Sequence, residues 1–504
     1  MGWNTQTYGA NPADMKRRRL SLYASVLAGS LCCQAAVADA LGGNPALAST
    51  PALSDAARGA LRQELAQLAK WVQQKNGRLS AQFVDVGSGQ VLAESDAERA
   101  QNPASNLKLL TAGAALDRLG PAHRFRTVVL GELRQGAVKD LVLKGDGDPD
   151  LRAEHLNAMA HTLVLRGLRQ VRGEILVDAS AFDARPLAPG FEVQPKEQAA
   201  FRAPIWGLSV DRNAVTVFVA PGASGEPAQV WTAPDGVATV QGKVGTAAAG
   251  SGQKAGVRVL QHGDSLAVQV HGSIAAGLPV QQLRRRIPDP SIWAGVVFAQ
   301  ALRRAGVQIS GAVRAGSGSA PVLAEHTSQP LRELVHALGK ESDNFVAEML
   351  LKAIAARAKG RPGTSAAGAA EVLAYAKSLG VPAAELEVRN GSGLFDGGSV
   401  SARGLATFLS RAYQEPRVGP ELTAQLAIGG VDGTLRSRFR SHAGARRVRA
   451  KTGTLAKVIA LSGFVLGSSG RGPVAFSILV QDVRAPHADT RARVDRVVAS
   501  ILSK

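Results

Sequence analysis

The feature that most constrains the fold is a change of sequence pattern near residue 125 and its reversal near residue 331. Before the first point the chain reads as a helix over residues 55–74, two strands joined at Gly87–Gly89, and an apolar helix in "SNLKLLTAGAALDRL". Between the two points it consists of short β-like segments broken by Gly, Pro and Asp, and then helical patterning returns. This order favours one α/β domain that carries helices from both ends of the chain and is interrupted by a β-rich insertion.

The same changes of pattern set the domain boundaries that we expect. A chain of 504 residues is long enough for two or three domains with a large core. The α/β domain should comprise residues 41–123 and 327–504. The insertion should form two small domains, one from residues 124–213 together with 281–326 and the other from residues 214–280.

Residues 1–40 read as a signal peptide with an upstream extension rather than as part of the fold. Met15–Arg19 is a positively charged n-region, Leu20–Cys33 is a short apolar stretch, and small residues up to Ala40 suit signal-peptidase cleavage. Residues 1–14 carry no such signal. Because the apolar stretch is too short for a comfortable membrane span, we expect an exported protein with no stable membrane anchor.

Composition excludes several classes of function. Both cysteines, Cys32 and Cys33, lie inside the expected signal peptide, so the mature chain offers no thiol for disulfides, thiolate catalysis or metal binding. The formal charge of +19 suggests nucleic acid, but aromatic residues make up only 4% of the chain and are not interleaved with basic ones. We therefore expect no nucleic-acid partner. The basic clusters at Arg284–Arg286 and 436–451 suit a solvated surface or attraction to an anionic substrate.

Several catalytic motifs are missing from the sequence. The nine histidines include no His-Glu-x-x-His, which argues against a zinc peptidase, and no Gly-x-Ser-x-Gly elbow is present. The segment "GDGDPD" at residues 145–150 resembles the start of a calcium loop but lacks its glycine and closing glutamate, so we interpret it as a structural turn. These observations predict no metal site and leave a serine activated by a lysine.

Two Ser-x-x-Lys pairs occur, Ser105–Lys108 and Ser251–Lys254. On a helix this spacing puts hydroxyl and amine on neighbouring turns of one face, and a desolvated lysine can accept the serine proton. Ser251 lies in a Gly/Ala-rich stretch that cannot exclude water, and we interpret it as loop. Ser105 opens an apolar helix, so Ser105 is the candidate nucleophile and Lys108 its base. The alternative for Ser105 is a simple helix cap.

Two further motifs offer groups that could face this serine. Ser342-Asp-Asn344 lies between two helical patterns, and read alone it suits a helix cap better than a catalytic loop. Lys451-Thr-Gly-Thr454 opens an apolar strand, where an ammonium and hydroxyls can bind a carboxylate and Gly453 lets a substrate approach closely. All three motifs, in this order and each on a suitable element, are far less likely to arise by chance than any one of them.

With "SNLK", "SDN" and "KTGT" the sequence resembles the penicillin-interacting serine enzymes, a group that includes β-lactamases and penicillin-binding proteins. The gap of 237 positions between Ser105 and Ser342 is typical of the low-molecular-mass class C penicillin-binding proteins, which are D-Ala-D-Ala carboxypeptidases and endopeptidases. Segments such as "GDGDPDL", "NGSGL" and "GGVDGTLRSRF" extend the resemblance over essentially the whole mature chain. It implies an α/β, serine β-lactamase-like transpeptidase domain, with an antiparallel sheet flanked by helices, around the large β-rich insertion.

The resemblance also implies roles for the candidate residues. Ser105 would attack the peptide carbonyl, Lys108 would accept its proton, and Ser342 supported by Lys451 would pass a proton to the leaving D-amino acid. The residues implied in substrate binding are Asn344, Thr452, Gly453, Thr454 and, in a Gly-Ser-Gly setting that is also typical of a turn, Ser392. Backbone N–H groups of Ser105 and Thr454 would form the oxyanion hole.

By the same resemblance the substrates are peptidoglycan stem peptides, β-lactam antibiotics are covalent inhibitors, no cofactor is needed and the enzyme is periplasmic. A β-lactamase of the same fold and a catalytically silent peptidoglycan-binding protein are the alternatives. One departure concerns Asn390, which stands where the family usually has an acid before Gly-Ser-Gly.

Overall fold

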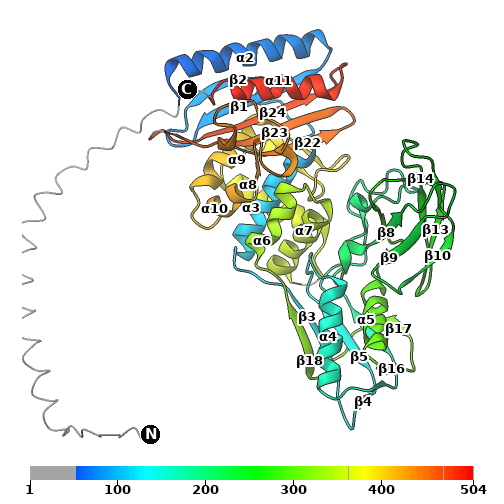
Figure 1. The fold of residues 1–504 in the computed structure, drawn as a ribbon. Helices are drawn as coiled ribbons and strands as arrows, with labels where there is room; N and C mark the ends of the chain where they lie inside the picture. Colours follow the sequence, from blue (N-terminus) through cyan, green and yellow to red (C-terminus); the bar gives the residue numbers. More distant parts are fainter. Residues whose placement is uncertain (1–52, 361, 469, 503–504) are drawn as a thin grey trace, which may run out of the picture. The chain divides into compact units, whose positions relative to one another are not determined.

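The computed structural model describes residues 53–360, 362–468 and 470–502, and it contains a six-stranded antiparallel sheet in the order β2-β1-β24-β23-β22-β21 (Figure 1). Its strands are β1 (Arg78–Asp85), β2 (Val91–Ser95), β21 (Ala427–Ile428), β22 (Val448–Leu455), β23 (Val458–Val465) and β24 (Val474–Gln481). Phe83 of β1 lies opposite Phe476 of β24. Strands from both ends of the chain therefore share one sheet, as the sequence pattern predicts.

Helices from both ends of the chain cover one face of this sheet. They are α2 (Asp55–Gln74) and α11 (His487–Ala499), which lie side by side in Figure 1. Ser54 caps α2 by accepting a hydrogen bond from the backbone N–H of Ala57. Apolar residues of both helices share a core with alternate strand residues such as Phe83 and Ile478. The predicted helix over residues 55–74 is confirmed.

A second layer of helices packs on the opposite face. The helices are α3 (Leu107–Leu119), α6 (Leu331–Lys340), α7 (Asn344–Lys359), α8 (Ser365–Ser378), α9 (Ala402–Gln414) and α10 (Gly419–Ala424). They share a core with the other set of strand residues, including Ala460 and Phe464. Because both faces are covered, every residue of β23 is buried, which explains why this strand reads as a continuous apolar run.

The insertion contains several small sheets. A five-stranded sheet has the order β17 (Val313–Ala315), β7 (Ile175–Asp178), β5 (Leu141–Gly145), β3 (Arg126–Leu130) and β18 (Val322–Thr327). A three-stranded sheet joins β16 (Gln308–Ile309), β6 (Gln170–Val171) and β4 (Ala137–Val138). The strands that lie between β7 and β16 in the sequence form three further sheets. The first has the order β15 (Gln281–Arg286), β8 (Ala214–Ala220) and β9 (Gln229–Ala233), the second β10 (Ala238–Gly242), β13 (Ser265–His271) and β12 (Gly256–His262), and the third pairs β11 (Gly245–Ala247) with β14 (Ser273–Ala275).

Two helices inside the insertion were not expected from the sequence. They are α4 (Ala153–Leu165) and α5 (Trp293–Arg304). In α4 the buried residues Leu156, Met159, Ala160 and Leu163 follow a helical period, which the surrounding Gly and Pro residues obscure. The insertion is thus β-rich but also uses helices to cover its sheet.

The insertion has an apolar cluster of its own, separate from the two that flank the six-stranded sheet. This cluster runs continuously through both expected small domains, from Val129 in the first to Val268 in the second. The boundaries between the two small domains stay a prediction.

The expected signal peptide over residues 1–40, with Cys32 and Cys33, lies outside the described residues. In the described ranges, no helix combines the length and the apolar character needed to cross a membrane.

Candidate active site

Ser105 lies in a single 3-10 turn, η1 (Ala104–Asn106), that leads directly into α3. The residue before it, Ala104, has φ +47°, which is rare for a residue with a side chain. Ser105 is half-buried, whereas its flanking residues Ala104 and Asn106 are fully buried. Strained backbone that presents one accessible hydroxyl in a buried setting is typical of functional sites.

Two glycines allow the chain to pack against this turn. A Cβ on Gly453 would lie 2.7 Å from the carbonyl oxygen of Pro103, and a Cβ on Gly393 would lie 1.9 Å from that of Ala104. Gly393 also has φ +72°, a conformation that favours glycine. Packing against the chain's own backbone therefore already requires a glycine at position 453, and the expectation that Gly453 makes room for substrate stays a prediction.

Lys108 is fully buried one turn after Ser105. Its Nζ lies 3.0 Å from Ser105 Oγ and 2.7 Å from both Asn344 Oδ1 and the carbonyl oxygen of Ser392. Burial lowers the pKa of Lys108 to about 7, while the nearby carboxylates of Glu348 and Asp343 act in the opposite direction. A substantial fraction of Lys108 is therefore neutral near pH 7.

The contacts of Lys108 suit a proton acceptor. A neutral amine has two N–H donors and one lone pair. Asn344 Oδ1 and the Ser392 carbonyl can take the two donors, so the lone pair is left to accept the hydroxyl proton of Ser105. Lys108 can act in this way only in its neutral form.

A second buried lysine holds the serine of the loop between α6 and α7. Lys451 Nζ donates to Ser342 Oγ at 2.8 Å and to the carbonyl oxygen of Thr452 at 2.9 Å. Burial, and secondarily the nearby Lys108, keep the pKa of Lys451 well below its usual value. Ser342 has φ +62°, so this loop, like the turn before Ser105, contains a strained residue.

The expected substrate-binding side chains border these groups. Asn344 begins α7 and, besides contacting Lys108, donates through Nδ2 to the carbonyl oxygen of Phe201 in the insertion at 2.9 Å. On β22, Thr452 Oγ1 donates to Thr434 Oγ1 at 2.9 Å, and Thr454 is exposed. Thr434, in the 3-10 turn η5 (Gly433–Leu435), is a hydroxyl next to the site that sequence reasoning missed.

The structure places Ser392 differently from the other candidates. Its side chain is fully buried and accepts a hydrogen bond from the backbone N–H of Leu394, while its carbonyl oxygen contacts Lys108. Ser392 therefore reaches the site through its backbone. Asn390 supports the same turn, because its Oδ1 accepts from the N–H groups of Ser392 and Gly393 and its Nδ2 donates to two carbonyls.

Glu348 holds this backbone in place and was not predicted. It is fully buried and accepts hydrogen bonds from the N–H groups of Gly391 and Ser392, both at 2.9 Å. Burial raises the pKa of its carboxyl group. The signal in the sequence is a single acid four residues after Asn344, on the same face of an otherwise apolar helical segment.

The second Ser-x-x-Lys pair has a different setting. Ser251 and Lys254 are exposed between β11 and β12, and Ser251 Oγ donates to the carbonyl oxygen of Ala248. This agrees with a loop. Among the residues that the structure describes, no group of three or more His, Cys, Asp or Glu side chains is placed to hold a metal ion.

Comparisons with known proteins point to one family. The family model described as "D-Ala-D-Ala carboxypeptidase 3 (S13) family" matches residues 62–501. A D-alanyl-D-alanine carboxypeptidase of Actinomadura sp. (strain R39) is 36% identical over 456 residues, which cover 86% of this chain and 84% of that protein.

Solved structures agree in fold. Penicillin-binding protein 4 (dacB) from Haemophilus influenzae matches with a TM-score of 0.72 at 24% identity, over 85% of this chain and 97% of that one. The same protein has also been solved in complex with a β-lactam. A peptidoglycan endopeptidase from Bdellovibrio bacteriovorus matches with a TM-score of 0.50 at 14% identity, over 84% of this chain and 92% of that one.

Proposed function

Because the chain belongs to the D-Ala-D-Ala carboxypeptidase 3 (S13) family, we propose that it removes the terminal D-Ala from peptidoglycan stem peptides through an acyl-enzyme on Ser105. The observation that carries this proposal is the contact of 3.0 Å between Ser105 Oγ and the fully buried Nζ of Lys108. A buried lysine with a lowered pKa beside an accessible serine hydroxyl is the arrangement that serine acylation needs.

In the first half of the reaction, Lys108 takes the hydroxyl proton as Ser105 Oγ attacks the carbonyl carbon of the penultimate D-Ala. The backbone N–H groups of Ser105 and Thr454 stabilise the oxyanion of the tetrahedral intermediate. The C–N bond then breaks, and the leaving amine takes a proton through Ser342, which Lys451 supports at 2.8 Å. The products of this half are free D-Ala and an ester on Ser105.

In the second half, water attacks the ester and Ser105 regains its proton. Asn344 orients the peptide amide of the acyl part in both halves, whereas Lys451 with the hydroxyls of Thr452 and Thr454 holds the terminal carboxylate only in the first half, before D-Ala leaves. No cofactor takes part. A β-lactam carries a carboxylate in the same relation to its reactive carbonyl, so penicillins acylate Ser105 by the same route. The complex of the Haemophilus influenzae relative with a β-lactam supports this.

Two alternatives belong to the same fold. A β-lactamase must deacylate quickly, which requires a base for the hydrolytic water besides Lys108. A catalytically silent peptidoglycan-binding protein would not need two buried lysines, since burying an amine is costly. The carboxypeptidase is therefore the better account of the site.

We also propose a DD-endopeptidase activity and a periplasmic location. Both reactions pass through the same acyl-enzyme and differ in what leaves, a free D-Ala or a second stem peptide. The endopeptidase half rests on the resemblance to class C penicillin-binding proteins. The location rests on the expected signal peptide and on the peptidoglycan substrate, because the cell wall lies outside the cytoplasm.

The test of this function is digestion of purified muropeptides with products separated by mass. Pentapeptide monomers should lose one D-Ala, and cross-linked dimers should be cut to monomers. If pentapeptides remain intact while the protein is folded, the carboxypeptidase proposal is wrong. If dimers persist while pentapeptides lose D-Ala, only the endopeptidase half is wrong.

A further inference from the structure

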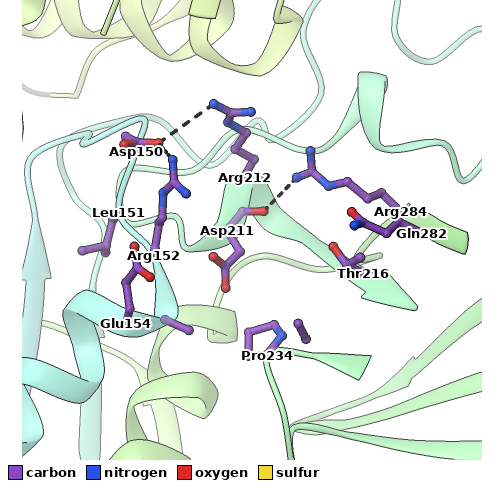
Figure 2. A pocket seen from close by; sticks show the side chains of 12 residues that line it. Asp150, Leu151, Arg152, Glu154, Asp211, Arg212, Thr216, Pro234, Gln282 and Arg284 are labelled. Carbon is purple, nitrogen blue, oxygen red and sulfur yellow. Dashed lines mark hydrogen bonds and ion pairs between the residues drawn. The ribbon is translucent and has the colours of Figure 1, made fainter. Parts of the chain in front are cut away.

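A cavity of about 400 Å³ lies in the insertion (Figure 2). One of its lining residues, Arg212, forms an ion pair with Asp343 in the loop that carries Ser342. Residues from the start of α4, from the 3-10 turn η3 (Asp211–Asn213), from β8 and from β15 line it. The reaction described above uses none of these residues. The cavity therefore needs an explanation of its own.

Arg284 of β15 lines this cavity without a carboxylate partner. Among the described residues, no carboxylate oxygen forms an ion pair with Arg284, and its guanidinium makes only a long hydrogen bond of 3.5 Å to the carbonyl oxygen of Asp211 (Figure 2). Burial, and secondarily the neighbouring Arg212, lower the pKa of Arg284. The next residue, Arg285, instead donates to the carbonyl oxygen of Val257. A partly buried arginine that forms no ion pair is stabilised when it binds an anion.

A second arginine is held at the same cavity by strained backbone. Arg212 has φ +59°, and its neighbours Asp211 and Asn213 have φ +51° and +47°. The buried side chain of Asn213 stabilises this turn by donating to the carbonyl oxygen of Pro204 at 2.9 Å and to Ser209 Oγ at 2.8 Å. Three consecutive residues in this conformation, fixed by buried hydrogen bonds, indicate that the position of Arg212 matters to function.

The acidic residues of the lining do not neutralise these two arginines equally. Asp150 accepts a hydrogen bond from Arg152 at 3.1 Å and lies 3.9 Å from Arg212. The carboxylate of Asp211 accepts from the backbone N–H of Ala153 at the start of α4, and Glu154 is largely exposed. In the described part of the chain, Arg284 therefore forms no direct ion pair, although the more distant carboxylates of Asp343 and Asp211 act on it electrostatically.

Arg212 connects the cavity to the candidate active site. Its guanidinium forms an ion pair of 2.8 Å with Asp343, which caps α7 by accepting from the N–H of Val346 at 3.1 Å. Asp343 lies between Ser342 and Asn344 in the sequence. A group bound by Arg212 is thus one ion pair away from the loop that holds both residues.

We propose that this cavity is an accessory binding site for a carboxylate-bearing peptide, with Arg284 and Arg212 as the groups that bind the carboxylate. That the peptide is a neighbouring stem peptide of peptidoglycan rests on the proposed function, whereas the choice of a carboxylate rests on the two arginines alone. The site binds one anionic stem peptide beside the stem peptide that Ser105 cleaves. It gives Arg284, one member of the basic cluster at Arg284–Arg286, a specific role.

The experiment uses the full chain after acylation with penicillin G, so that Ser105 is blocked. The probe is acetyl-L-Ala-γ-D-Glu-L-Lys, which lacks D-Ala, and the control peptide has both carboxylates amidated; binding is followed by calorimetry. We expect the free acid to bind and the amidated peptide not to. Arg284→Gln should weaken binding at least about tenfold, the typical effect of losing one charge-assisted hydrogen bond, and Arg285→Gln should bind like the parent.

Equal affinity of Arg284→Gln and the parent would overturn the proposal, as would equal binding of the amidated peptide. Labelling with fluorescent penicillin separates this result from a failure of the proposed function, because Arg284→Gln should label like the parent. If Arg284→Gln unfolds, Arg284→Lys keeps the charge but not the two-pronged geometry. It should then show an intermediate loss of affinity, and an unchanged affinity would count against the site.

Discussion

The cost of burying Lys108 and Lys451 near one another is lowest when both amines are neutral. Each is fully buried, and the charge of Lys108 further depresses the pKa of Lys451. With a pKa of about 7, Lys108 changes from proton donor to proton acceptor close to neutral pH. Desolvation thus leaves a large fraction of this amine unprotonated, and able to accept a proton, near neutral pH.

The lowered pKa of Lys108 predicts how acylation depends on pH. Below pH 7 Lys108 is protonated, so the second-order rate of acylation by penicillin should fall about tenfold per pH unit and should level off above pH 7. Stopped-flow measurements between pH 5 and 9 test this. Lys108→Arg stays charged over the whole range and should acylate slowly at every pH. A flat profile for the parent would show that Lys108 is not the base.

The residues that could be predicted are those with fixed spacing along the chain. Ser105, Lys108 and Ser342 belong to short motifs, and the structure brings them together with Lys451. Glu348 could not be assigned in the same way, because its role depends on where the backbone of residues 391–392 runs. The close packing that requires a glycine at position 453 likewise depends on Pro103, which is far away in the sequence.

At the level of elements, the turn η1 is held against the sheet by a buried polar chain. Asn106 donates through Nδ2 to Ser462 Oγ at 2.7 Å, and Ser462 donates to Ser477 Oγ at 2.9 Å. Ser462 lies opposite Lys451 in the register of β22 and β23. These hydrogen bonds therefore hold Asn106, which lies between Ser105 and Lys108, against β23, the strand next to β22.

Ser462→Ala should loosen this attachment. It leaves the buried amide of Asn106 without an acceptor, which costs about 1–3 kcal/mol, and it should slow acylation by penicillin. Thermal unfolding and the labelling rate measure the two effects. Ser477→Ala is the matched control, because it keeps the hydrogen bond between Asn106 and Ser462 and should acylate nearly as fast as the parent. Equal rates in Ser462→Ala and the parent would rule out the positioning role.

Elements with strong local signals were predictable and those with mixed signals were not. The helix over residues 55–74 and the strand pair around Gly87–Gly89 follow from period, cap and turn residues. Helices α4 and α5 were missed because each lies among Gly- and Pro-rich strands. The two helices are recognised from their packing in the apolar core of the insertion and not from their local sequence pattern.

At the scale of the whole molecule, three apolar clusters stabilise the described part of the chain, two around the six-stranded sheet and one in the insertion. The insertion also buries an acid. Asp148 is only 3% exposed, and burial raises the pKa of its carboxyl group to about 7. One oxygen accepts from the backbone N–H of Asp150, and the other lies 3.6 Å from His326.

Asp148 should make the stability of the protein depend on pH. Since its pKa is higher in the folded than in the unfolded chain, the folded state retains a proton between about pH 4 and 7 that the unfolded state has lost. Stability from this group is present at low pH and is lost as the pH rises through 7. Asp148→Asn should therefore stabilise the protein by about 1–3 kcal/mol at pH 8 and by less at pH 5. Thermal unfolding at both values tests this, and an equal effect at both would contradict the assignment.

The central claim is that Ser105 is acylated. Intact-protein mass spectrometry after exposure to penicillin G, followed by proteolysis and mapping of the adduct, tests it most directly. We predict one long-lived adduct on the peptide that contains Ser105, no adduct in Ser105→Ala, and normal adduct formation in Ser251→Ala. Rapid loss of the adduct with turnover of the drug would instead identify a β-lactamase. An adduct of equal yield in Ser105→Ala would contradict the account.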